Sequence, residues 1–218
     1  MQTPPTHERL VAQLVADVRP VRPLWSPRTR LALWLALQTL TLGVAVELGL
    51  RQDLGDHLRQ PLFLLQVGAL VVAGAMAAAV ALRGAVPGMV NGRLAVTVLL
   101  LLGSAAVSLV SLEPVVAIRS SWGFVARGAV CVICILGYAA IPWSVLFVAV
   151  RRGAPLDAPV VGVCAGTAAL LFAAAAVRIA CPIDEALHLL TWHAMPVALG
   201  AALSGVAGAR WLDRWREA

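Results

Sequence analysis

The chain has 218 residues, of which 61% are hydrophobic and only 13% are charged, and its mean hydropathy is +0.87. A soluble domain of this size is about 45–50% apolar and about 25% charged, so the composition predicts a membrane protein. The net charge of +6 comes from 17 positive residues that are all arginines, scattered between apolar runs, and this pattern argues against nucleic-acid binding.

The first 30 residues predict an arm that precedes the membrane domain. Residues 6–18 predict a short amphipathic helix, because Thr6 can cap it, Glu8 suits its positive N-terminal end, and apolar residues recur on one face. This apolar stripe comprises Leu10, Val11, Leu14, Val15 and Val18. Prolines follow and hold the chain extended. Such a segment cannot build a core of its own, so the stripe needs either the membrane surface or the groove of a partner protein.

Six apolar stretches follow that meet or approach the length of a membrane-spanning helix, about 20 residues. The expected spans are residues 31–50, 62–82, 94–112, 128–150, 160–180 and 194–209. Only helices and closed barrels satisfy every backbone group in lipid, and these runs lack the alternation of barrel strands. The sequence therefore predicts an all-α polytopic membrane protein, with an arm at residues 1–30 and a bundle of six transmembrane helices at residues 31–218.

The arginines indicate the direction of insertion, because short cytoplasmic segments carry an excess of positive charge. With the N-terminus inside, twelve arginines fall in cytoplasmic segments: Arg9, Arg19, Arg22, Arg28, Arg30, Arg83, Arg93, Arg151, Arg152, Arg210, Arg214 and Arg216. Five fall in outer segments: Arg51, Arg59, Arg119, Arg127 and Arg178. We therefore expect both termini in the cytoplasm. Glu47 and Glu113 are expected near outer helix ends, within reach of headgroups.

The outer side gathers metal-binding side chains in and near the segment CPIDEALHLLTWH, residues 181–193. Cys181 follows the fifth span and Cys131 lies near the outer end of the fourth, so the two thiols are expected at the same depth. They could form a disulfide in an oxidising compartment. Alternatively, together with His188 and His193, they could bind copper(I), zinc or another thiophilic metal ion.

The spacing within this segment bears on its geometry. His188 and His193 are five residues apart, so on a regular helix they diverge by about 140°. A break near Trp192 is needed for them to converge. Asp184 and Glu185 precede His188 on the same helical face, where a carboxylate could orient the imidazole.

Two motifs together resemble a known family. The arm segment LVADVRPVRPL, residues 14–24, the six spans, and the outward C-x6-H-x4-H spacing of residues 181–193 look like the NrsF-type anti-sigma factors, the negative regulators of sigma F. The resemblance covers essentially the whole chain. It implies a bacterial inner-membrane protein with six spans, whose cytoplasmic N-terminus holds an extracytoplasmic-function (ECF) sigma factor inactive. The sigma-binding residues expected in the arm are Leu10, Leu14, Asp17, Pro20, Val21, Pro23 and Leu24.

The resemblance also implies a sensor. In this family a pair of outward cysteines is tied to activation of the sigma factor by heavy-metal or oxidative stress, and the matching residues here are Cys131 and Cys181. Cys134 is an extra thiol near the pair, which leaves open which partner Cys131 uses. A copper, zinc or other thiophilic ion is thus expected as a signal, and no cofactor is obligatory.

Two other classes of membrane protein compete for the same residues. A thiol oxidoreductase that serves quinone needs a second cysteine pair within reach, and Cys164 is expected near the inner end of the fifth span. A metal-binding transporter needs a series of ligands along a path through the bilayer. Beyond Cys131 and Cys134 the expected spans contain no such series. We therefore expect a regulator without enzyme activity and without direct nucleic acid binding.

Overall fold

The computed structural model describes residues 6–16, 23–89, 103, 110, 112–113 and 121–212. The regular secondary structure in these residues is helical throughout, which confirms the all-α prediction. The helices are α1 (Thr6–Ala16), α2 (Pro27–Leu48), α3 (Leu54–His57), α4 (Pro61–Gly84), α6 (Ser121–Arg151), α7 (Ala158–Ala180), α8 (Ala186–Leu189) and α9 (Met195–Trp211). A π-helical turn, η1 (Leu190–Ala194), joins α8 to α9.

Five helices among the described residues are long and apolar enough to cross a membrane. They are Pro27–Glu47, Pro61–Gly84, Trp122–Arg151, Ala158–Ala180 and Ala186–Trp211. These match five of the expected spans, whereas the expected third span, residues 94–112, lies almost wholly outside the described residues. The prediction for the last span was wrong at its start. The final helix begins at Ala186 rather than at residue 194, because the segment with the two histidines folds into the helix instead of forming a loop.

Local sequence signals explain several helix ends. The Ser26 side chain caps α2, and Pro27 fits the first helical turn, where an amide hydrogen is not needed. The helix ends at Gly49, whose φ of 133° suits a residue without a side chain. Asp157 caps α7 by accepting a hydrogen bond from the amide of Val160.

The central helix of the bundle is α7. In its most apolar stretch 72% of the residues are buried, compared with 17% in α2. Small residues let α7 and α9 approach closely, since a Cβ on Gly162 would lie only 2.5 Å from the backbone oxygen of Ser204. The Ser204 hydroxyl donates to the Gly162 carbonyl at 2.7 Å and accepts from the Trp143 indole at 2.8 Å. One serine therefore ties α6, α7 and α9 together.

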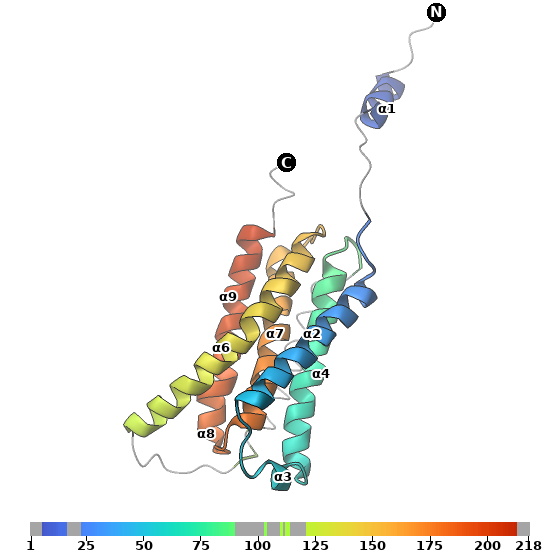
Figure 1. The fold of residues 1–218 in the computed structure, drawn as a ribbon. Helices are drawn as coiled ribbons and strands as arrows, with labels where there is room; N and C mark the ends of the chain where they lie inside the picture. Colours follow the sequence, from blue (N-terminus) through green and yellow to red (C-terminus); the bar gives the residue numbers. More distant parts are fainter. Residues whose placement is uncertain are drawn as a thin grey trace, which may run out of the picture.

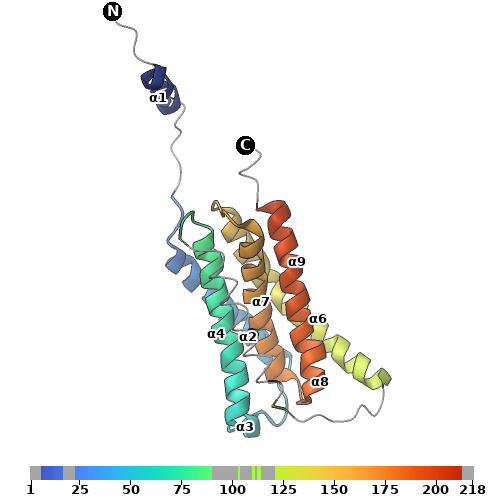
Figure 2. The same cartoon turned by 180° about the vertical axis from the view of Figure 1, so that it is seen from behind.

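The two ends of the bundle carry different features, as Figures 1 and 2 show. α1 stands clear of the bundle, at the end where α2 begins and α9 stops. α3 and α8 lie at the opposite end. α1 spans Thr6–Ala16, and its side chains from His7 to Ala16 are exposed, as expected for an arm without a core of its own. Val18, expected in the same helix, lies outside the described residues.

Candidate metal centre

Four side chains bring their ligand atoms together near the end of the bundle opposite α1. The sulfurs of Cys131 and Cys181 and a ring nitrogen each of His188 and His193 all lie within 4.8 Å of one another. All four residues are buried. These residues are called the ligand cluster below, and they are the four that the sequence singled out.

His188 and His193 converge because the helix changes its hydrogen-bonding pattern between them. In the π-helical turn η1, bonds run between residues five apart rather than four apart. Residues five apart then come round to nearly the same side, and the two imidazole centroids are 5.5 Å apart. The expected break near Trp192 is therefore a π-turn within a continuous helix, a feature that is frequent at functional sites.

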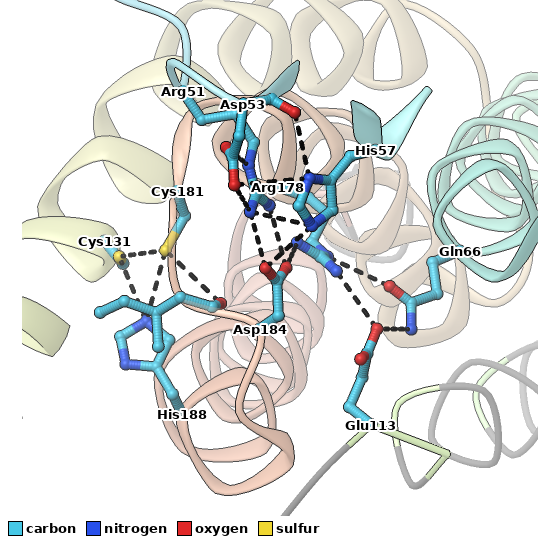
Figure 3. Close-up of polar contacts among 11 residues, drawn as sticks. Arg51, Asp53, His57, Gln66, Glu113, Cys131, Arg178, Cys181, Asp184 and His188 are labelled. Carbon is cyan, nitrogen blue, oxygen red and sulfur yellow. Dashed lines mark hydrogen bonds and ion pairs between the residues drawn. The ribbon is translucent and has the colours of Figure 1, made fainter. Parts of the chain in front are cut away.

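The two cysteines arrive from different elements. Cys131 lies on α6, and Cys181 is the residue that directly follows α7. Because α6 packs against α7, the two sulfurs are 3.8 Å apart. The His188 Nε2 atom lies 3.6 Å from each sulfur (Figure 3).

These separations fit a tetrahedral metal ion. Zinc binds thiolate sulfur at about 2.3 Å and imidazole nitrogen at about 2.0–2.1 Å. Tetrahedral angles then place two sulfurs about 3.8 Å apart and sulfur and nitrogen about 3.5 Å apart. The distances of 3.8 Å and 3.6 Å in the ligand cluster match both values. A disulfide, by contrast, requires the two sulfurs to approach to about 2.05 Å.

The environment of Cys181 favours its thiolate. The Cys131 thiol donates toward the Cys181 sulfur, and this contact, helped by His188, lowers the pKa of Cys181 below the ordinary thiol range against the opposing effect of burial. The thiolate is the form that binds metal ions. The His193 ring is buried beside Cys181, and its Nε2 atom has no hydrogen-bond partner among the described residues.

An aromatic wall stands beside the ligand cluster. The Phe124 ring packs edge-on against the His188 ring, and the two ring centroids are 6.3 Å apart. The centroid of the Phe124 ring lies 5.5 Å from that of the Trp192 ring. A Cβ on Gly128 would lie 2.1 Å from the Trp192 indole, so a glycine is required for α6 to come this close to η1. Gly128 lies one turn before Cys131 and therefore controls how near Cys131 comes to the other three ligands. Sequence reasoning missed this contact, and the only signal was a glycine one turn before an outer cysteine.

A second polar cluster lies beside the ligand cluster, on the other side of the segment that follows α7 (Figure 3). Its members, called the arginine cluster below, are Arg51, Asp53, His57, Gln66, Glu113, Arg178 and Asp184. The Asp184 carboxylate accepts hydrogen bonds from Arg51 at 2.9 and 2.6 Å and from Arg178 at 2.5 Å. Burial raises the pKa of Asp184, but these hydrogen bonds outweigh it and lower the pKa to about 2.

This arrangement changes the roles expected for the two carboxylates of the segment. Asp184 faces the two arginines, whereas we expected it to orient His188. The arginines attract the Asp184 carboxylate more strongly than His188 does, because the planar guanidinium group offers charged donors to both carboxylate oxygens. Glu185 precedes α8 as its N-cap residue, and its side chain makes no capping hydrogen bond.

Arg178 and Glu113 are also placed differently from expectation. We expected Arg178 to act as an outer topology charge and Glu113 to reach headgroups. Instead their side chains are only 4% and 12% exposed and pair at 3.3 Å. Gln66 donates to Glu113 at 2.8 Å and accepts from Arg178 at 3.1 Å. Apolar patterning alone cannot reveal this pairing, since its members come from distant parts of the sequence.

The remaining candidates lie outside the ligand cluster. His57 belongs to the arginine cluster, with its Nε2 atom 3.2 Å from Asp184. Cys134 is half-buried against the hydrophobic core, and Cys164 is fully buried in the first half of α7, as expected for packing residues.

The residues expected to bind a sigma factor are only partly described. Leu10 and Leu14 on α1 are 57% and 62% exposed. Pro23 and Leu24, between α1 and α2, are exposed as well. Asp17, Pro20 and Val21 lie outside the described residues.

Comparison with known proteins identifies the family. The family model described as NrsF, negative regulator of sigma F, matches residues 14–215. Searches of curated proteins and of solved structures found no match. The matched range runs from within α1 to beyond α9 and confirms the resemblance seen in the sequence. The chain therefore belongs to the NrsF family, and the description of that family is negative regulation of a sigma factor.

Proposed function

We propose that the chain is a six-span anti-sigma factor of the bacterial inner membrane. Its arm, residues 1–30, holds an ECF-type sigma factor inactive, and a thiophilic metal ion at the ligand cluster weakens that hold. The observation that carries the proposal is the position of two unlike features at opposite ends of one bundle: an exposed apolar stripe and a buried set of metal ligands.

Six spans are supported by the path of the described helices. α4 ends at the end of the bundle where α2 begins, and α6 starts at the opposite end (Figure 1). The sequence between α4 and α6 includes the apolar run at 94–112, which is long enough for a further span. An even number of crossings then keeps both termini on one side, which the arginine distribution predicts to be the cytoplasm.

The output half of the proposal rests on α1. Its apolar side chains are exposed, with Leu10, Val11, Leu14 and Val15 between 56% and 65% accessible. An amphipathic helix of this kind binds by laying its apolar face into a hydrophobic groove, with anchors three and four residues apart. A sigma factor is the partner that the family description supports.

The sensing half rests on the ligand cluster. Two thiols and two imidazoles at tetrahedral separations suit zinc, copper(I) or another thiophilic ion. Oxidation of Cys131 and Cys181 to a disulfide would use the same thiols, but their sulfurs would first have to move closer together. Metal binding therefore needs the smaller rearrangement.

A pull-down tests the output half. The full-length protein in lipid nanodiscs serves as bait for soluble extract of the source organism, beside a Leu10→Asp/Leu14→Asp variant and a matched Ala12→Asp/Ala16→Asp variant. The control pair has the same spacing but lies on the opposite face of α1. We expect the wild type and the control to retain a sigma factor and the leucine variant to lose it. Equal recovery of a sigma factor by all three proteins would contradict docking through the apolar stripe.

A further inference from the structure

We infer that α2 transmits the state of the ligand cluster to the arm, and that Trp34 and Arg51 are the positioning residues that attach α2 to the two elements on which the ligands lie. The inference rests on the proposed function and concerns its regulation. Of the four ligands, Cys131 lies on α6, while the other three lie on the segment at residues 181–193. A metal ion bound by all four ligands would fix these two elements relative to each other.

The first attachment joins α2 to α6. The indole of Trp34 donates a buried hydrogen bond of 2.9 Å to the carbonyl of Pro142, and Arg30 donates to the carbonyl of Ala149. Both acceptors lie on α6, the helix that carries Cys131. Pro142 lies inside α6, and a proline is where a helix most readily bends, so Trp34 contacts α6 at its most deformable point.

The second attachment joins the other end of α2 to the segment that carries Cys181. Arg51, three residues after the last residue of α2, has a fully buried side chain and holds both oxygens of Asp184. Asp184 lies three residues after Cys181. Bidentate arginine–carboxylate pairs fix orientation as well as distance, so a shift of this segment pulls on the end of α2.

Between these attachments α2 is only loosely packed. The buried share of its apolar stretch is 17%, the lowest among the five long helices described. An element with few buried contacts shifts at a low free-energy cost. The polar attachments at Trp34 and Arg51 therefore control where α2 lies, whereas α7 stays fixed by its packing.

The inner end of α2 leads directly into the arm. Ser26 caps α2 and residues 23–26 continue toward α1, so a tilt of α2 changes the position of the residues that precede it. The ligand atoms already lie at tetrahedral separations, so a metal ion that bridges Cys131 and Cys181 fixes α6 and the segment at 181–193 in this arrangement. Without the ion, the two elements can shift relative to each other. α2, attached to both, tilts and carries the arm with it.

The test uses full-length protein in nanodiscs with Zn²⁺ as the probe and the captured sigma factor as the partner. Trp34→Phe keeps the ring but removes the donor to Pro142, and Arg51→Lys keeps the charge but removes the bidentate contact. The controls are Trp122→Phe, since Trp122 is 79% exposed, and Arg59→Gln, since the Arg59 side chain is 85% exposed. Zn²⁺ affinity, sigma affinity with and without Zn²⁺, and hydrogen exchange of residues 23–34 are measured for each protein.

In the wild type and both controls we expect Zn²⁺ to weaken sigma binding at least about 5-fold, the lower range of allosteric effects, and to change the exchange of residues 23–34. In Trp34→Phe and Arg51→Lys the Zn²⁺ affinity stays within twofold, but both responses fall below about twofold. Full responses in both variants would overturn the inference and leave the proposed function standing. A wild type that binds Zn²⁺ without any loss of sigma affinity would refute the proposed sensing itself, and the inference with it.

Discussion

The ligand cluster and the arginine cluster are neighbours, yet they differ in how far their polar groups are satisfied. In the arginine cluster Arg178 pairs with Asp184 and Glu113, and Arg51 pairs with Asp184 and Asp53. In the ligand cluster the contacts are made through sulfur, at 3.6 to 3.8 Å, and the buried Nε2 atom of His193 has no hydrogen-bond partner among the described residues. Buried polar groups are normally satisfied, so a cluster that leaves one of them open indicates a site for a ligand, whereas the satisfied cluster holds helices together.

The sharpest test of this contrast removes Arg178. Arg178→Gln removes a buried arginine and leaves the partly buried Glu113 and Asp184 with fewer positive partners, and breaking a buried ion pair costs about 3 kcal/mol at the low end of its range. The melting temperature should fall by roughly 6–12 °C, while Zn²⁺ affinity changes far less. Thermal denaturation in detergent measures the first quantity and competition titration the second. Arg59→Gln, which removes an exposed ion pair, should change the melting temperature little.

The opposite outcome is expected when both thiols are removed. Cys131→Ser/Cys181→Ser deletes two of the four ligands, and since loss of a mere outer-shell partner already weakens metal binding about 10–100-fold, the Zn²⁺ affinity should fall by more than about 100-fold. The substitution is close in size, so the melting temperature without metal should stay near that of the wild type. Co²⁺ spectroscopy should show the loss of thiolate bands. A variant that kept its Zn²⁺ affinity would contradict the role of the ligand cluster.

A smaller effect is expected at Gly128, which touches neither cluster's polar atoms. Gly128→Ala places a Cβ against the Trp192 indole and pushes α6, with Cys131, away from the other ligands. We expect about a 10-fold loss of Zn²⁺ affinity, the lower range for groups that only position a ligand. Gly137→Ala is the matched control on the same helix, because its Cβ would meet no atom of the described residues within 4 Å. Equal affinities in the two variants would show that the aromatic wall does not position Cys131.

The dependence of the melting temperature on acid pH tests the contribution of the arginine cluster. The pKa of Asp184 is lowered from 3.8 to about 2, so its charged form stabilises the fold above about pH 4, and this contribution is lost as the pH falls toward 2. The melting temperature of the wild type should therefore fall more steeply between pH 4 and pH 2 than that of Asp184→Asn, by about 2–4 °C for each kcal/mol lost. Parallel curves would mean that the ion pairs of Asp184 do not stabilise the bundle.

The sequence predicted those parts of the fold that depend on the length and hydropathy of the helices. Of the six expected spans, five are present as long apolar helices among the described residues, and the meeting of Cys131 with Cys181 followed from two neighbouring helices. The convergence of His188 and His193 was anticipated only as a break near Trp192, because a π-turn has no signature in local composition.

The arginine cluster could not have been predicted in the same way. Arg51, Glu113 and Arg178 are far apart in the sequence and meet only after the helices have packed. For the same reason Asp184 was assigned to the nearby His188, although the two arginines attract its carboxylate more strongly. Local spacing identifies which residues can interact, whereas tertiary packing decides which of them do.

The most direct test of the account is a Zn²⁺ titration of the preformed complex between the full-length protein in nanodiscs and its sigma factor. Sigma affinity is measured at each metal concentration for the wild type and for Cys131→Ser/Cys181→Ser. We predict that saturating Zn²⁺ weakens sigma binding at least about 5-fold in the wild type and leaves the variant unchanged. Stoichiometric Zn²⁺ binding by the wild type with no change in sigma affinity would contradict the claim that the ligand cluster controls the arm.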